Sequence, residues 1–68
     1  MDHPRRVFRK SVGATLLDVA ELVGVPEDLV QKWEKQIRVA SAENDARWVE
    51  ALKVLEARAA ARRERVRP

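Results

Sequence analysis

The chain has 68 residues, no cysteine and a formal net charge of +3. A chain of this length forms one small domain that buries only about 60% of the surface its unfolded form exposes. The absence of cysteine excludes disulfides and thiolate metal sites as supports for so small a core. No apolar run reaches the roughly 20 residues that cross a bilayer, and the N-terminus lacks an apolar signal core, so we expect no membrane association and a cytoplasmic location.

Charge is distributed unevenly along the chain. Residues 1–10 carry a net +3, residues 11–56 carry −4 and residues 57–68 carry +4. Basic segments at both ends favour an anionic partner such as nucleic acid, whereas the acidic middle does not. The sequence therefore separates a basic start, an acidic centre and a basic end.

The pattern of apolar residues is helical throughout, and no stretch alternates as a strand does. We predict an all-α fold: a small bundle of four to five helices with a long C-terminal helix. The first helix is expected after Pro4, because Val7, Phe8 and Val12 have helical spacing. It should end near Gly13.

The second helix is predicted to begin after Thr15, a good N-cap, with Asp18 three residues later in a near capping box. Its inner face is predicted to consist of Leu16, Val19, Ala20 and Val23. Gly24 should end it, because glycine adopts the left-handed C-terminal conformation at low cost.

A third helix is expected to start at Pro26, where the missing N–H costs nothing. Its inner face is predicted to consist of Leu29, Val30, Trp33 and Ile37. A loop then leads to Ser41, a second plausible N-cap. No glycine or proline follows until Pro68, which predicts one helix of about 35 Å.

The second and third predicted helices have the features of a helix-turn-helix, since Ala20 is small where the helices cross and Gly24 supplies the turn. Residues 13–55 resemble the Cro and phage-repressor type of helix-turn-helix domain, the Xre-like family. The resemblance is carried by Gly13-Ala14-Thr15, Val19-Ala20, Gly24-Val25, Val30, Trp33-Glu34, Arg38, Ser41-Ala42-Glu43-Asn44 and Ala51-Leu52. Residues 13–56 are accordingly interpreted as the helix-turn-helix domain.

The resemblance implies DNA contacts at the positions of Leu16, Glu27, Asp28, Gln31 and Lys32. The contacts that we predict for this chain are Thr15, Glu27, Asp28, Gln31, Lys32, Lys35 and Arg38. The chain departs from the family at Pro26, where a serine-like cap is usual, and at Gln36, where glycine is common. It also departs at Glu27 and Asp28, where members carry neutral or basic polar residues.

The acidic pair Glu27 and Asp28 has three interpretations. Carboxylates in the first turn of a helix gain about 0.3–1 kcal/mol from the helix dipole. Alternatively, Glu27 accepts a hydrogen bond from a cytosine amino group in the major groove. In the third interpretation this face avoids phosphates and meets a protein.

The basic N-terminal segment, residues 1–12, is interpreted as an arm with a short first helix. Its predicted phosphate or minor-groove contacts are Arg5, Arg6, Arg9 and Lys10. The alternative is a disordered solubilising tail.

The C-terminal helix contains a heptad-like series formed by Trp48, Leu52, Leu55 and Ala59. Trp48 and Leu52 are expected in the core of the domain. Beyond them we expect little core to contact, so residues 57–68 form a basic extension. The predicted contacts with a second copy of the chain are Leu55, Ala59 and Val66; binding along DNA and fraying are the alternatives.

The sequence does not favour catalysis. It has one histidine, no glycine-rich phosphate loop and no nucleophile with an evident base, so we predict no enzyme activity, cofactor, small-molecule ligand or metal. Met1-Asp2-His3 has the groups to chelate copper or nickel, but a histidine near a chain terminus is usually incidental.

The resulting hypothesis is a sequence-specific regulator of transcription, Cro- or repressor-like, that binds duplex DNA with a homodimer as one option. Its alanine- and arginine-rich composition suggests a phage or a high-GC bacterium. The alternatives are an excisionase- or MerR-like accessory protein and an adaptor that uses the same scaffold to bind a protein.

Overall fold

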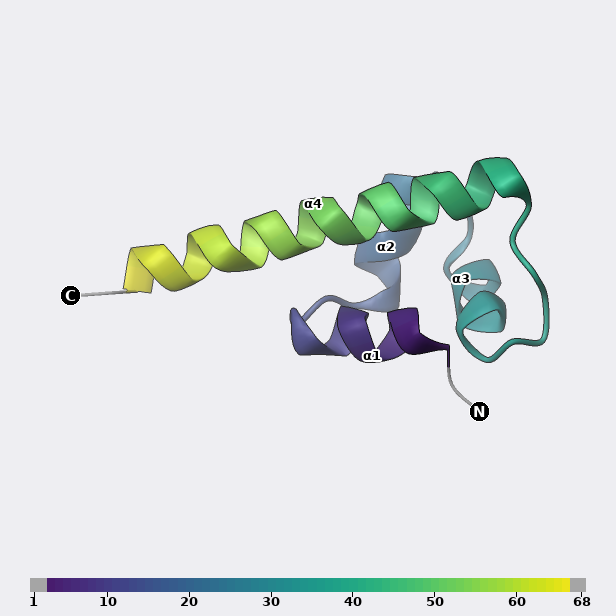
Figure 1. Cartoon of the computed structure of the whole chain (residues 1–68), viewed down its shortest axis with the longest axis horizontal. Helices are drawn as coiled ribbons and strands as arrows, with labels where there is room; N and C mark the ends of the chain where they lie inside the picture. Colours follow the sequence, from purple (N-terminus) through teal and green to yellow (C-terminus); the bar gives the residue numbers. More distant parts are fainter. Residues whose placement is uncertain (1–2, 67–68) are drawn as a thin grey trace.

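The computed structural model describes the backbone of residues 3–66 and the side chains of residues 3–64. Within this range the chain forms four helices, α1 (Pro4–Ser11), α2 (Leu16–Val23), α3 (Glu27–Glu34) and α4 (Ala42–Val66), and no strand. The predicted all-α fold with a long C-terminal helix is therefore confirmed. In Figure 1, α1 and α2 lie beneath and behind the middle of α4, and α3 lies below its N-terminal end. None of the helices described is both long and apolar enough to cross a membrane.

Helix α1 is held at both of its ends by side-chain hydrogen bonds. His3 is the N-cap, and its Nδ1 accepts a hydrogen bond of 3.1 Å from the backbone N–H of Arg5. Pro4 occupies the first turn, where its missing N–H leaves no bond unmade. At the other end the Ser11 hydroxyl donates to the carbonyl of Phe8 at 2.6 Å. The predicted short first helix is thus confirmed, and it begins directly at Pro4.

Helix α2 begins and ends as its sequence predicts. The Thr15 hydroxyl accepts from the Asp18 N–H at 3.1 Å, and the Asp18 carboxylate accepts from the Thr15 N–H at 2.9 Å. This reciprocal capping box satisfies two N–H groups that a helix start leaves unpaired. Gly24 closes the helix with φ 87°, in the left-handed region that suits glycine.

Helix α3 is shorter than the sequence suggests. Pro26 is its N-cap rather than its first residue, and Lys35 is its C-cap. Gln36 then adopts φ 60°, a left-handed conformation at the position where glycine is common in the family that the sequence resembles. The chain turns there, and the Ile37 N–H bonds to the carbonyl of Lys32 at 2.9 Å. The prediction that Ile37 lies on the inner face is wrong: its side chain is 68% exposed, because the helix ends before it.

The core lies where α2 packs against α3 and α4. Its buried residues are Ala14, Val19, Ala20, Val23, Val30, Trp33, Trp48, Ala51, Leu52 and Leu55. The ring centroids of Trp33 in α3 and Trp48 in α4 lie 5.4 Å apart, and this contact joins the two helices. Ala20 is buried at the centre, as predicted from its small size.

Only the first half of helix α4 contributes buried side chains to the core. Ser41 caps it, as predicted, by accepting from the Asn44 N–H at 3.2 Å. The prediction that Leu55 has little core to contact is wrong, because its side chain is only 6% exposed and belongs to the core. Past Leu55 the helix continues beyond the other three, as Figure 1 shows. We call residues 57–66, the part of the predicted basic extension whose backbone is described, the extension.

Candidate nucleic-acid interface

Helix α3 presents one polar face to the outside because its other face is buried. Val30, Trp33 and Glu34 anchor the helix in the interior. Gln31 and Lys35, which directly follow the buried residues Val30 and Glu34, are exposed. The helix is thus fixed in rotation about its own axis, and its outer face has a defined direction.

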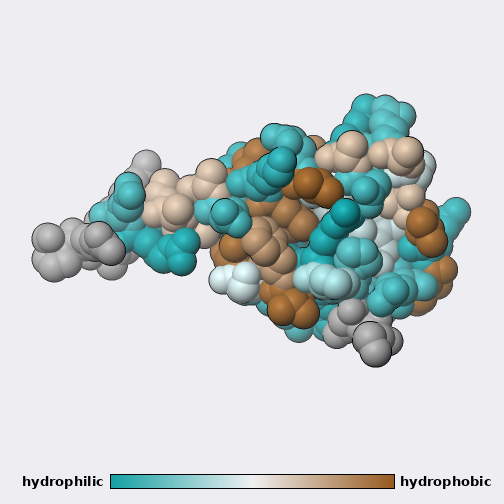
Figure 2. Space-filling model, in the orientation of Figure 1, coloured by the Kyte–Doolittle hydropathy of each residue, from teal (hydrophilic) through white to brown (hydrophobic). Residues whose placement is uncertain are grey.

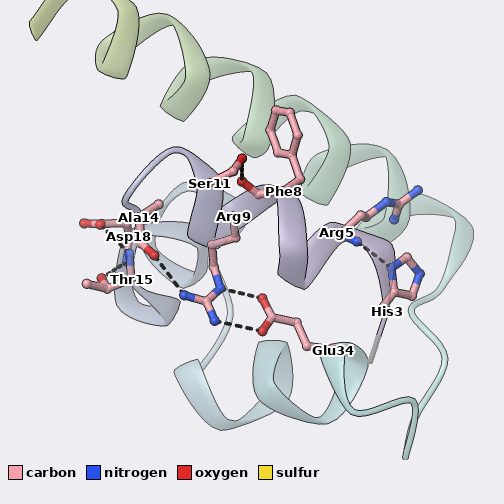
Figure 3. Close-up of polar contacts among 9 residues, drawn as sticks. All are labelled: His3, Arg5, Phe8, Arg9, Ser11, Ala14, Thr15, Asp18 and Glu34. Carbon is pink, nitrogen blue, oxygen red and sulfur yellow. Dashed lines mark hydrogen bonds and ion pairs between the residues drawn. The ribbon is translucent and has the colours of Figure 1, made fainter. Parts of the chain in front are cut away.

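The strongest polar anchor of α3 is an ion pair with α1, drawn in Figure 3. Glu34 is 1% exposed and Arg9 is 8% exposed. The guanidinium of Arg9 donates to the two carboxylate oxygens of Glu34 at 2.7 and 3.1 Å, and to the carbonyl of Ala14 at 2.8 Å. A bidentate pair with a third hydrogen bond satisfies both buried charges and ties α1, α3 and the turn before α2 together.

This arrangement corrects the prediction for Arg9. The sequence suggested a phosphate contact, but the side chain is buried and its donors point at Glu34 and Ala14. Arg9 therefore positions α3 and has no surface to offer to an external anion. The buried partner Glu34 was not identified from the sequence as having a role. Its one available signal was a carboxylate directly after the core residue Trp33.

The acidic start of α3 is exposed, and it partly neutralises a lysine on the same face. Pro26 supplies no side-chain hydrogen bond to the first turn, so Glu27 and Asp28 are the groups that face the positive end of the helix dipole. Asp28 also lies 3.9 Å from the ammonium of Lys32, one turn further on. Both side chains of this pair are well exposed, so the contact is weak.

The start of α2 lies at the surface, but its hydroxyl is engaged. Thr15 is exposed, yet its Oγ1 accepts the capping hydrogen bond from Asp18. The hydrogen bonds from Thr15 hold the pKa of the Asp18 carboxyl below its ordinary value of 3.8.

The loop after α3 carries a further exposed cation. Arg38 is exposed and lines a small groove together with Leu29, Trp33, Val39, Ser41 and Asn44. Val39, its neighbour, is 95% exposed. Gln31, Lys35 and Arg38 are thus exposed, as are the other predicted DNA contacts Thr15, Glu27 and Asp28.

The N-terminal basic residues do not form a free arm. Arg5 pairs with Asp45 of α4, and its guanidinium lies 4.6 Å from the centre of the Trp48 ring. The hydrogen bond from Arg5 lowers the pKa of the Asp45 carboxyl. Arg6 is half-buried, whereas Lys10 is exposed. Residues 4–11 are thus a packed helix, and Lys10 is the predicted contact there that clearly reaches solvent.

His3 also has a structural place, with its ring 4.9 Å from that of Trp48. The suggested chelate with Met1 and Asp2 involves residues outside those described. Among the residues described, no group of three or more histidine, aspartate or glutamate side chains is arranged to hold a metal ion.

The predicted contacts with a second copy are not brought together as one surface. Leu55 is in the core, and Ala59 is half-buried beside a groove at the extension. The side chain of Val66 lies outside the described residues. The heptad-like series is therefore used mainly within the chain itself.

Comparison with protein-family models, curated proteins and solved structures gives no match to this chain.

Proposed function

We propose that this chain binds duplex DNA through the outer face of α3 and regulates transcription. The observation that carries the proposal is the anchoring of α3: three buried residues fix one face, and polar side chains occupy the other. The major groove of B-DNA is about 12 Å wide and admits one helix of this kind. The family resemblance of residues 13–55 supports the same use of α3.

Base contacts are assigned to the side chains that point outward from α3. Gln31 offers both an amide donor and an acceptor, which suits bidentate contact with adenine. Lys32 lies one residue further along and can donate to guanine, once its contact with Asp28 opens. These two residues would determine sequence preference.

Phosphate contacts are assigned to exposed cations around α3. Lys35 lies at the C-terminal end of α3, and Arg38 lies in the loop that follows. Lys10 is exposed at the end of α1. Phosphate contacts fix register and supply salt-dependent affinity. Because Arg9 and Arg5 are engaged inside the protein, we expect fewer phosphate contacts than the basic N-terminus implies.

The proposal is tested by selecting bound duplexes from a random pool and titrating variants against the selected site. Gln31→Ala and Lys32→Ala should each weaken specific binding by about 1–3 kcal/mol. Lys53→Ala, an exposed lysine on α4, is the matched control and should leave specificity unchanged. Unaltered binding by both α3 variants would overturn the assignment of α3 as the reading helix.

The acidic pair is tested by the double substitution of Glu27→Gln and Asp28→Asn. If the carboxylates only stabilise the helix start, affinity for every duplex should rise and stability should fall slightly. If Glu27 reads cytosine, preference at one base position should relax as well. If this face binds a protein, the α3 variants should leave DNA binding unchanged and the double variant should abolish the protein contact instead.

A further inference from the structure

The extension forms two grooves with the body of the domain, one on each side of Arg62. The first has a volume of about 330 Å³ and is lined by Ala14, Asp18, Leu55, Arg58, Ala61 and Arg62. The second has a volume of about 520 Å³ and is lined by Ser11, Val12, Gly13, Ala59, Arg62 and Arg63. We call the pair the Arg62 grooves. They lie where the extension overhangs the connection between α1 and α2.

The walls of the Arg62 grooves combine apolar and cationic groups. Apolar groups come from both sides, from Leu55 and Ala59 of α4 and from Val12 and Ala14 before α2. Figure 2 shows brown and tan groups in the middle of the face viewed, and tan and teal groups side by side along the projecting helix. Each groove is large enough for one or two apolar side chains.

The cations of the grooves form no ion pair with the acidic side chains that the structure describes. Arg58, Arg62 and Arg63 are exposed, and no hydrogen bond or ion pair joins them to another side chain among residues 3–64. Asp18 is the one carboxylate in the lining of the two grooves. Its charge is held mainly by the N–H and hydroxyl groups of Thr15, and Arg62 and Arg58 act on it only as more distant charges. The grooves therefore carry an excess of positive charge.

We propose that the Arg62 grooves bind a protein segment that presents apolar side chains flanked by carboxylates, such as an acidic amphipathic helix. Its apolar side chains would enter the grooves, and its carboxylates would pair with Arg58, Arg62 and Arg63. Such a segment matches the surface in both hydrophobicity and charge. The proposal is independent of DNA binding by α3.

Two other occupants fit the surface less well. A second copy of the extension would bring arginines against arginines. Three members of the apolar series that would pair the copies, Trp48, Leu52 and Leu55, are already used in the core. A DNA backbone presents charged phosphates, which gain no favourable contact from an apolar lining. In Figure 1 the extension also projects away from α3, on the far side of α1 and α2.

The test uses the full chain, isotope-labelled for NMR, and two synthetic helical peptides. One peptide carries a stripe of leucines flanked by glutamates, and the other carries lysine in place of every glutamate. The acidic peptide should shift the amide signals of Val12, Ala14 and Ala59, whereas the basic peptide should not. Replacing the leucines of the acidic peptide with serine should also abolish its binding.

Matched charge reversals locate the contact. Arg62→Glu should weaken binding of the acidic peptide about tenfold, whereas Lys53→Glu, on α4 but outside both grooves, should change it much less. Equal effects of the two reversals would overturn the proposal, because the attraction would then be general.

The remaining outcomes assign the surface to another occupant. Self-association by sedimentation that Arg62→Glu abolishes would show that a second copy fills the grooves. Shifts at the same amides on addition of duplex DNA, with none from the acidic peptide, would show a nucleic-acid surface. Each of these results overturns the proposal.

Discussion

The two basic ends of the chain have opposite fates in the folded protein. In α1, Arg9 is buried against Glu34 and Arg5 is paired with Asp45. In the extension, the arginines described are exposed and no acidic side chain pairs with them. Two segments of similar composition thus differ in the fold: the arginines of α1 form ion pairs within the protein, whereas those of the extension form a cationic surface.

The difference depends on which acidic residues the fold brings near each end. Glu34 and Asp45 lie 25 and 40 residues from their arginine partners in sequence, and packing of α1 against α3 and α4 places them in contact. Among the described side chains of the extension, Arg58, Arg62 and Arg63 form no ion pair, and Asp18 acts on Arg58 and Arg62 only as a charge at longer range. Charge that is available for binding is therefore less than the sequence suggests at the N-terminal end.

The largest expected effect comes from breaking the buried pair. Arg9→Met should destabilise the protein by about 3–5 kcal/mol, because it leaves the buried carboxylate of Glu34 without a counter-charge. Urea unfolding followed by circular dichroism measures this. The double variant Arg9→Met with Glu34→Met should recover much of the loss. A small effect of Arg9→Met alone would show that Arg9 does not anchor α3.

A smaller effect is expected at the half-exposed pair. Arg5→Ala removes the contact with Asp45 and the stacking on Trp48, and should cost about 1 kcal/mol. Thermal unfolding measures it, with Lys10→Ala as the control on the same helix. If the two variants melt alike, the N-terminal end is as free as the extension.

Acid should weaken the protein through Asp18 and Asp45. Their pKa values in the folded protein lie below the ordinary 3.8. Their contribution to stability is therefore present above about pH 4, and it is lost as the pH falls through the lowered folded values. Unfolding measured between pH 6 and pH 2 should show a flatter acid limb in Asp18→Asn with Asp45→Asn.

The smallest effect is expected in the extension. Replacing Arg58, Arg62 and Arg63 together with alanine should change stability by no more than about 0.5 kcal/mol, because their side chains are exposed. Urea unfolding of this variant beside Arg9→Met measures the contrast between the two ends directly. A loss as large as that of Arg5→Ala would mean that the extension is tied to the domain.

The sequence by itself determined the helices, because their signals are local. Thr15 with Asp18, Gly24 and Ser41 mark ends through bonds within four residues, and apolar spacing marks the buried faces. The end of α3 was misplaced because a left-handed glutamine, Gln36, gives no such signal.

Only the tertiary structure decided which charges remain available. The outer positions of α3 follow from periodicity, so Gln31 and Lys35 could be placed at the surface in advance. The burial of Arg9 could not, because its partner Glu34 comes from a different helix and the pairing exists only once α1 packs on α3. Local hydrogen bonds fix a helix from neighbouring residues, whereas the environment of a charge depends on every element that packs around it.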